Sequence, residues 1–336
     1  MKLPAPREFS RLLLLALLLS FLVMSAGAFT RLSHAGLGCP DWPGCYGRWV
    51  LPATDPAQLQ SHFPDQPLDP VKAWIEMGHR YMAASLGLLV LGLAIWAWRL
   101  RGRYQVPTTA LSMLVALVVV QGAFGRWTVT LKLWPQVVTL HLLGGGLIFS
   151  VLLLSWLQTR RQQAIPGASS PPSYVRSWAL LGGVVLLCQL ALGGWTSANY
   201  AALACPDLPL CHRGVDVTVD WRSGFNLLQA VGPSYLGGQL DNAARVAIHL
   251  GHRLGALATF LVLGGLAYWL IRCGTGLLQR RGRWLLGALL VQGGLGALNV
   301  LLGLPLVLAL AHHAGAVLLV AAWLGVWDGL VREPAR

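Results

Sequence analysis

Eight stretches of this sequence are apolar for long enough to cross a lipid bilayer as helices, which takes about 20 residues. Charged residues make up only 11 % of the chain, whereas soluble domains average about 25 %. The sequence therefore predicts an all-α polytopic membrane protein with eight transmembrane helices. The expected segments are residues 11–30, 74–98, 108–126, 137–157, 177–197, 244–271, 284–303 and 306–328.

The positive charge of the chain is explained by membrane topology rather than by a nucleic-acid partner. The formal net charge is +13, but no nucleic-acid-binding motif is present, so no such partner is expected. With the N-terminus in the cytoplasm, most Lys and Arg residues fall in cytoplasmic loops, as the positive-inside rule predicts. We therefore expect both termini in the cytoplasm and the long loops on the outer side. A cleaved signal peptide is the alternative for the first segment, but cleavage would destroy the repeat described next.

The second half of the sequence repeats the first. The stretch Ile75–Ala83, with its His-Arg pair, returns as Ile248–Ala256. The repeat predicts a tandem duplication, with two four-helix bundles related by a pseudo-two-fold axis along the membrane normal. The expected domains are residues 1–161 and 177–336, joined by a polar cytoplasmic linker at 162–176. Other matches keep the same order in both halves: Gly27 with Gly193, Cys39 with Cys205, Gln121 with Gln292, Gly125 with Gly296, and His141 with His312.

Each half also carries a pair of cysteines in its first outer loop. Cys39 and Cys45 form one pair, and Cys205 and Cys211 form the other. The space outside the cytoplasmic membrane is oxidising, so the leading interpretation is two short-loop disulfides. A metal site and a redox-active thiol pair are the alternatives.

Four histidines lie inside the apolar segments at repeat-matched positions. Polar groups in hydrocarbon are costly and usually functional. Their segments all enter the membrane from the outer side, so each half supplies two imidazoles at similar depth on two different helices. That arrangement is what bis-histidine ligation of haem needs, although a packing hydrogen bond could explain any single one. These residues are His79, His141, His252 and His312; His313 is a competing ligand next to His312, which the repeat alignment favours.

Charged residues beside these histidines distinguish the two halves. Arg80 and Arg253 each follow a histidine and suit a haem propionate, with lipid headgroups as the alternative. Glu76 lies three residues before His79, on nearly the same helix face, and can accept or donate a proton. The second half has His249 at that position. We therefore expect chemistry in the N-terminal half and a permanent haem in the C-terminal half, unless Glu76 merely pairs with Arg80.

Taken together, these motifs resemble the haem A synthase family over essentially the whole chain. The resemblance rests on Glu-x-x-His-Arg in the second segment, on histidines in the fourth, sixth and eighth, and on a cysteine pair in the first outer loop. It implies an oxidoreductase acting on a CH group, which converts a methyl group of haem O to the formyl group of haem A for cytochrome oxidase assembly. It also implies a bacterial cytoplasmic (inner) membrane protein with periplasmic loops.

The resemblance also implies roles for the site residues. Substrate haem O would lie between His79 and His141 with Arg80 beside it. A haem b cofactor would have its iron between His252 and His312, with Arg253 near a propionate. Glu76 matches the essential carboxylate of the family. Cys39 and Cys45 match its functional loop pair, whereas Cys205 and Cys211 form a second pair.

Partners and alternatives follow from the same reasoning. No flavin or nicotinamide motif is present, so an external electron donor or acceptor is expected. The other partners are haem O, haem O synthase and the lipid bilayer, and a homo-oligomer is compatible with the sequence. The main alternative is a dihaem membrane cytochrome b that only carries electrons, which has no evident need for Glu76. A transporter is a second alternative, but no helix is obviously broken in mid-membrane.

Overall fold

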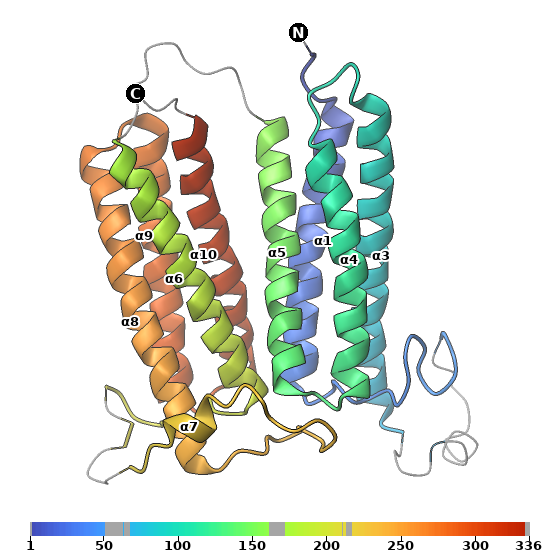
Figure 1. Ribbon diagram of the computed structural model, residues 1–336, viewed down its shortest axis with the longest axis vertical. Helices are drawn as coiled ribbons and strands as arrows, with labels where there is room; N and C mark the ends of the chain where they lie inside the picture. Colours follow the sequence, from blue (N-terminus) through green and yellow to red (C-terminus); the bar gives the residue numbers. More distant parts are fainter. Residues whose placement is uncertain are drawn as a thin grey trace. The chain divides into compact units, whose positions relative to one another are not determined.

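A computed structural model describes residues 2–50, 63, 68–160, 172–209, 211–212 and 217–332. Within these ranges all regular secondary structure is helical, and only isolated β-bridges occur besides. The helices, shown in Figure 1, are α1 (Arg7–Leu32), α3 (Pro70–Leu100), α4 (Thr108–Thr130), α5 (Pro135–Thr159), α6 (Ser173–Ala198), the short α7 (Trp221–Gly224), α8 (Asn242–Cys273), α9 (Gly276–Leu301) and α10 (Leu306–Arg332).

Eight of these helices are long and apolar enough to cross a membrane, which confirms the predicted fold class. The helices α3 and α8 begin earlier than their apolar segments because polar residues cap them. The carboxylate of Asp69 accepts from the main-chain N–H groups of Val71 and Lys72, both at 3.1 Å. Asp241 accepts from the N–H of Ala244 at 2.9 Å. Such caps satisfy N–H groups at the helix start, where hydropathy gives no signal.

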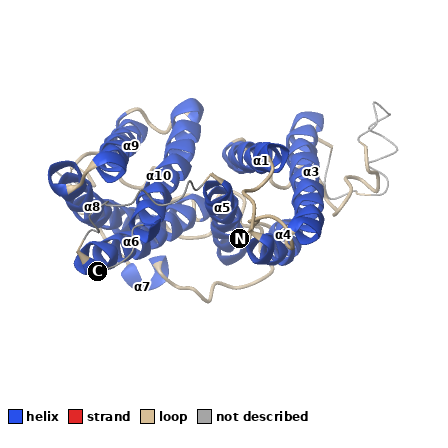
Figure 2. Ribbon diagram, turned by 90° about the horizontal axis from the view of Figure 1, so that it is seen from above, coloured by secondary structure: helices blue, strands red, loops and turns tan. Residues whose placement is uncertain are grey.

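The described chain divides into two compact units. The first comprises Met1–Phe149 with Leu227–Gln239, and the second comprises Ser150–Asn226 with Leu240–Arg336. Figure 2 shows each group of helices from its end. The predicted linker at 162–176 begins within residues 161–171, which lie outside the described part of the chain. The predicted domain boundaries and the pseudo-two-fold axis therefore stay predictions.

Each unit is held together by contacts between neighbouring helices. In the first unit, the rings of Phe9 on α1 and Trp96 on α3 meet edge to face at 5.3 Å. In the second, the indole N–H of Trp323 on α10 donates to the carbonyl of Ala179 on α6 at 2.8 Å. The indole N–H of Trp178 on α6 likewise donates to the carbonyl of Val262 on α8 at 3.1 Å. These bonds satisfy the polar edge of a partly buried indole.

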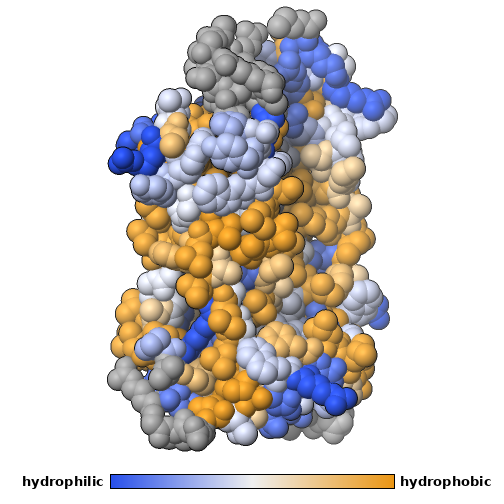
Figure 3. Space-filling view, turned by 60° about the vertical axis from the view of Figure 1, so that its left-hand side comes forward, coloured by the Kyte–Doolittle hydropathy of each residue, from blue (hydrophilic) through white to orange (hydrophobic). Residues whose placement is uncertain are grey.

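The outward faces of the long helices are apolar, as in a protein surrounded by lipid. Large side chains such as Leu88, Leu261 and Val291 are more than half exposed. On the face drawn in Figure 3, hydrophobic side chains gather along the middle of the helices, and hydrophilic ones gather toward the ends. A soluble protein would not expose so much apolar surface, so we treat the chain as a multi-pass membrane protein.

Both predicted cysteine pairs are disulfide-bonded. Cys39 is joined to Cys45 in the segment after α1, and Cys205 is joined to Cys211 in the segment after α6. The leading interpretation of the two pairs is thus confirmed. We refer to the ends of the helices that carry these loops as the disulfide end of each unit.

A segment from the second half of the sequence packs into the first unit. The N–H of Tyr235 donates to the carbonyl of Lys132 at 2.9 Å. The indole N–H of Trp134 donates to the main-chain carbonyl of Gln229 at 3.0 Å. The side-chain amide of Gln136 donates to the main-chain carbonyl of Leu227 at 2.9 Å. Residues 227–239 therefore sit on the turn between α4 and α5. The repeat in the sequence gives no sign of this arrangement.

Candidate functional site

The four predicted histidines lie on α3, α5, α8 and α10, each within about three turns of the start of its helix. All four helices start at the disulfide end of their unit. This placement follows from the repeat, because each histidine occupies a matched position in a matched helix. The structure thus brings the imidazoles to one end of each helix group.

In the first unit, His79 and His141 form a pair. Their imidazoles lie close enough for a charge on one to be felt at the other. The ring of His79 is hydrogen-bonded to the main chain of Val23 on α1, and that of His141 to the main chain of Gln121 on α4. In both residues the Nδ1 atom is buried with no hydrogen-bond partner in the described part of the chain.

In the second unit, His252 and His312 form the corresponding pair, again close enough to interact electrostatically. The ring of His312 is hydrogen-bonded to the main chain of Gln292 on α9. Its Nδ1 has no partner among the described residues. The Nδ1 of His252 lies 3.2 Å from the amide nitrogen of Gln189 on α6.

Glycines on the preceding helices make room for the four rings. A Cβ atom added at any of these glycines would lie within van der Waals contact of a ring Cε1 atom, or closer. The helix carrying each histidine can therefore approach its neighbour only where the neighbour has no side chain. The four distances from added Cβ to ring Cε1 are 3.0 Å for Gly27 and His79, 3.4 Å for Gly125 and His141, 3.3 Å for Gly193 and His252, and 3.1 Å for Gly296 and His312.

The histidine pairs have the donor chemistry that would hold a haem iron. A ligating imidazole needs one nitrogen without a competing hydrogen bond and a second that is oriented by a neighbour. His79, His141 and His312 each combine an unpartnered Nδ1 with a main-chain bond to the next helix. Within the described residues, no group of three or more His, Cys, Asp or Glu could hold a metal ion. The donor set that the structure does show is one pair of imidazoles in each unit.

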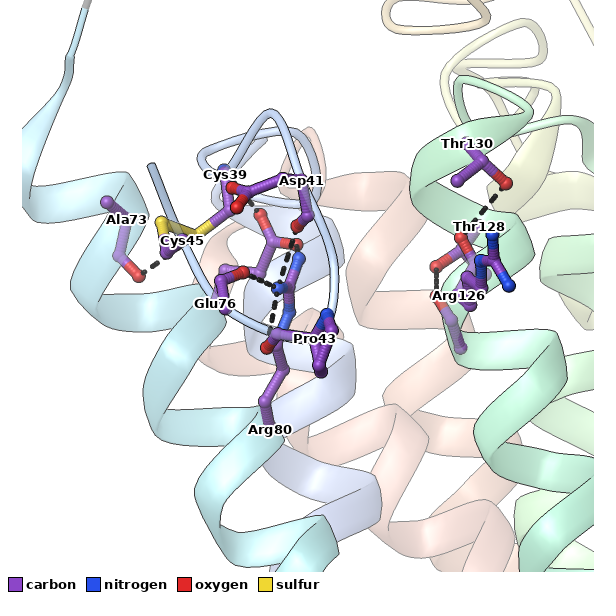
Figure 4. A network of polar contacts seen from close by, with 12 residues as sticks. Cys39, Asp41, Pro43, Cys45, Ala73, Glu76, Arg80, Arg126, Thr128 and Thr130 are labelled. Atoms are coloured by element: carbon purple, nitrogen blue, oxygen red, sulfur yellow. Dashed lines mark hydrogen bonds and ion pairs between the residues drawn. A yellow bond between two sulfur atoms is a disulfide. The ribbon is translucent and has the colours of Figure 1, made fainter. Parts of the chain in front are cut away.

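Glu76 is buried, with 4 % of its surface exposed, and it connects α3 to the first disulfide loop. Its Oε2 accepts from the main-chain N–H of Cys39 at 2.9 Å, and its Oε1 forms an ion pair with Arg80 (Figure 4). The guanidinium also donates to the carbonyl of Asp41 at 3.0 Å and to that of Pro43 at 3.3 Å. Arg80 thus bridges the carboxylate and the loop.

The pairing of Glu76 with Arg80 is one of the two roles that the sequence allowed. The ion pair does not exclude proton transfer, because the carboxylate keeps its place one turn from His79 on the same helix. The guanidinium of Arg80 donates to Glu76 and to carbonyls of the disulfide loop. Its role toward a propionate stays a prediction.

Arg253 ties down the second disulfide loop in the same way. Its guanidinium donates to the carbonyl of Cys205 at 2.7 Å and to that of Pro209 at 3.4 Å. His249, which replaces the carboxylate, is buried with 4 % exposure and is hydrogen-bonded to the main chain of Ala201. In both units an arginine is therefore hydrogen-bonded to the disulfide loop. The units differ at the matched buried position, which is Glu76 in the first and His249 in the second.

The first disulfide loop is ordered by Asp41, whose carboxylate accepts from the N–H groups of Tyr46 at 2.6 Å and Gly47 at 2.8 Å. Burial raises the pKa of the Tyr46 phenol above its usual range, and the nearby Asp41, Asp69 and Glu76 carboxylates raise it further. The phenol therefore stays neutral at physiological pH. The loop holds its shape through these contacts as well as through the disulfide.

Three glutamines complete the surroundings of the histidines, and no sequence motif assigned them a role. The side-chain amides of Gln121, Gln189 and Gln292 each reach a histidine on the neighbouring helix. The repeat offered a signal, because Gln121 and Gln292 stand at matched positions.

Known proteins resemble this chain over nearly its full length. Residues 10–324 match the COX15-CtaA family, described as cytochrome oxidase assembly protein. The chain is 45 % identical to the heme A synthase of Shewanella oneidensis over 314 residues, which cover 93 % of each chain. It is 27 % identical to that of Rhizobium rhizogenes, over 95 % of this chain and 89 % of the relative. The heme A synthase of Geobacillus kaustophilus is 28 % identical, over 86 % and 81 % of the two chains.

Proposed function

Because this chain belongs to the COX15-CtaA family of cytochrome oxidase assembly proteins, we propose that it works as a haem A synthase. The reaction is oxidation of a methyl group of haem O to the formyl group of haem A. The observation that carries the proposal is the presence of one histidine pair in each unit, each ring packed against a glycine of the neighbouring helix. The name of the relatives favours this enzyme over a cytochrome that only carries electrons.

The two histidine pairs have different roles in this proposal. His79 and His141 hold the substrate haem O, and His252 and His312 hold the iron of a haem b cofactor. The bound haem b supplies one-electron transfer between the protein and an external partner. The protein contributes helices that fix the imidazoles of His79, His141 and His312 by a main-chain bond, which leaves Nδ1 of each available for iron.

Glu76 is the residue we assign to proton transfer at the substrate methyl. Oxidising a methyl to a formyl group with water as the source of the oxygen releases protons, and electrons that pass to the external acceptor, so a base near the reacting carbon is needed. The N–H of Cys39 and the guanidinium of Arg80 hold the carboxylate in place. In the second unit His249 occupies the matched position, in keeping with a haem that is not modified.

We place the protein in the bacterial inner membrane with both termini in the cytoplasm. Disulfides persist in an oxidising compartment, and both disulfides lie at the same end of their units. Arg99 lies in the last turn of α3, and Arg101 and Arg103 follow the helix at this other end, where the positive-inside rule expects them. Haem O made by haem O synthase would supply the substrate, and an external acceptor would take the electrons.

The test is to express the chain in a host that makes haem O but not haem A, and to separate extracted haems by chromatography. Haem A should appear only when the protein is present. Glu76→Ala should abolish haem A while haem b stays bound. Haem O left unconverted beside bound haem b would instead identify an electron carrier, and loss of all bound haem from the intact protein would remove the histidine assignment.

A further inference from the structure

Side-chain amides connect three of the four histidine-bearing helices to their neighbours. Gln121 on α4 donates to the main-chain carbonyl of His141. Gln189 on α6 donates to the carbonyl of His252 at 3.2 Å, and the same nitrogen lies 3.2 Å from the ring Nδ1. The amide nitrogen of Gln292 on α9 lies 3.4 Å from Nε2 of His312. Each glutamine therefore acts at a histidine rather than elsewhere on the facing helix.

A glycine makes room for each of these amides. The glycine lies three residues after the histidine, and a Cβ atom there would overlap the side-chain oxygen of the glutamine. The amide can therefore reach the histidine only if this position on the facing helix has no side chain. The three pairs are Gln121 with Gly144, Gln189 with Gly255, and Gln292 with Gly315.

The fourth histidine has no such pair. Gln189 lies four residues before Gly193, and the residue four before the matching Gly27 is Val23. Three residues after His79 stands Met82 instead of a glycine. The glutamine and glycine of the other three sites are thus replaced by Val23 and Met82. The contact from α1 to His79 is instead a hydrogen bond between the main chain of Val23 and the imidazole.

The amides matter because an imidazole that ligates iron through one nitrogen carries a proton on the other. The acceptor of that proton fixes the ring and raises its basicity, and removing such an acceptor costs about 10- to 100-fold in metal affinity. The Oε1 atoms of Gln189 and Gln292 are buried with no partner in the described part of the chain. After rotation of the amide, the oxygen of Gln189 can accept the ring proton of His252, and that of Gln292 can share the ring proton of His312 with the main chain of Gln292.

We propose that Gln121, Gln189 and Gln292 are positioning residues for His141, His252 and His312, and that Val23 makes His79 the ligand that releases. The inference rests on the proposed function. A cofactor haem held by two braced histidines would stay bound through many turnovers. A substrate haem braced at His141 alone would enter and leave by exchange at His79.

The first test removes the braces from the C-terminal unit and does not depend on turnover. Gln189→Met and Gln292→Met keep side-chain volume but lose the amide, whereas Gln189→Glu and Gln292→Glu keep an acceptor oxygen. The readouts are the midpoint potential of haem b and its rate of transfer to apomyoglobin. The Met variants should shift the potential and release haem about 10- to 100-fold faster, and the Glu variants should restore slow release.

Gln279→Met is the matched control, because the amide of Gln279 on α9 donates to the carbonyl of Ile271 at 2.9 Å and not to a histidine. It should leave both readouts unchanged. Potential and release rate equal to wild type in both Met variants would overturn the positioning role, whether or not the protein makes haem A.

The second test installs the missing brace. The double substitution Val23→Gln with Met82→Gly should slow release of haem A about 10-fold or more, so that purified protein carries more of it. Val23→Leu is the apolar control and should release haem A at the wild-type rate. Normal haem b content reports that the variants fold.

If the double variant does not fold, Gln121→Met provides the converse measurement, because loss of the brace at His141 should speed the release of substrate haem. Unchanged release in a folded double variant would overturn the assignment of His79 as the exchanging ligand, and unchanged release in Gln121→Met would overturn the positioning role of Gln121. A wild-type protein that makes no haem A would overturn the proposed function, while the haem b measurements would still decide the role of Gln189 and Gln292.

Discussion

At the residue scale, the two arginines beside the histidines make similar hydrogen bonds but face different charged groups. Arg80 and Arg253 both donate to carbonyls of a disulfide loop. Arg80 is also in an ion pair with the buried carboxylate of Glu76, whereas the carboxylate that acts on Arg253 is that of Asp207, which is only partly buried. Removing one partner of a buried ion pair leaves the other charge uncompensated, which strongly destabilises the folded protein.

We therefore expect Arg80→Gln to destabilise the protein more than Arg253→Gln does. The difference should be about 3 kcal/mol, the usual cost of stranding a buried charge. Thermal unfolding in detergent, followed by intrinsic tryptophan fluorescence, measures both variants side by side. Equal melting temperatures would mean that Glu76 is not charged in the folded protein.

The glycines that touch the histidine rings allow a second comparison on a single helix. A Cβ at Gly296 on α9 would lie 3.1 Å from Cε1 of His312, whereas a Cβ at Gly287 on the same helix meets nothing within 4 Å. Gly296→Val should displace the imidazole and remove haem b, and Gly287→Val should retain it. The absorption spectrum of the reduced pyridine complex gives the haem content of each. Equal haem content in the two variants would contradict the close approach of His312 to α9.

Sequence reasoning reached the residues of this site but not all of their contacts. The i, i+4 spacing of Glu76 and Arg80 made their ion pair foreseeable. The bond from Cys39 to Glu76 was not foreseeable, because it depends on how the disulfide loop folds back over α3. The glutamine contacts were partly foreseeable. The repeat marked Gln121 and Gln292, but the rotation of each helix about its axis determines which atoms their amides contact.

At the scale of the helices, an ion pair joins α9 and α10 at the end away from the disulfides. Arg281 donates to the carboxylate of Asp328 at 3.0 Å, and Asp328 is 1 % exposed. The guanidinium also donates to the carbonyl of Gly325. The corresponding positions in the first half of the sequence are apolar, so this connection belongs to the second unit alone.

Asp328→Leu alone should destabilise the second unit by about 3 to 5 kcal/mol, because it strands the Arg281 guanidinium. The double substitution Arg281→Leu with Asp328→Leu should recover most of that loss, since no charge is then left in the contact. Melting temperatures of the two single variants and the double variant complete the cycle. Additive losses would show that the two residues act independently.

The helices themselves were the most predictable elements of the fold. Length and hydropathy identify a membrane-spanning segment because an unsatisfied main chain cannot cross hydrocarbon. The helix starts were less predictable, since the caps of Asp69 and Asp241 lie outside the apolar runs. The four-residue helix α7 has no hydropathy signal and was not predicted.

At the scale of the whole molecule, the division of the chain is less simple than its repeat suggests. Residues 227–239 belong to the second half of the sequence but to the first compact unit. Hydropathy and repeat matching cannot reveal this, because the segment is outside both the apolar runs and the matched motifs. Its contacts depend on the particular turn between α4 and α5.

The segment should loosen when its two side-chain bonds are removed. In Trp134→Phe with Gln136→Leu, the carbonyls of Gln229 and Leu227 lose their donors, at about 1 kcal/mol for each bond. Cleavage of purified protein at this segment by a chymotrypsin-like protease should then become about 30-fold faster. Trp127→Phe on α4 is the control, because Trp127 is 43 % exposed and contacts Phe124 rather than this segment. Equal cleavage rates would contradict the placement of 227–239.

This placement has a consequence for how such a protein can change over evolutionary time. A gene that has just been duplicated and fused encodes two equivalent modules, and either one could be lost or recombined. Once one copy contributes residues 227–239 to the surface of the other, neither module is complete by itself. The fusion then becomes irreversible, and the two copies are inherited as a single unit in which each can specialise without becoming independent again.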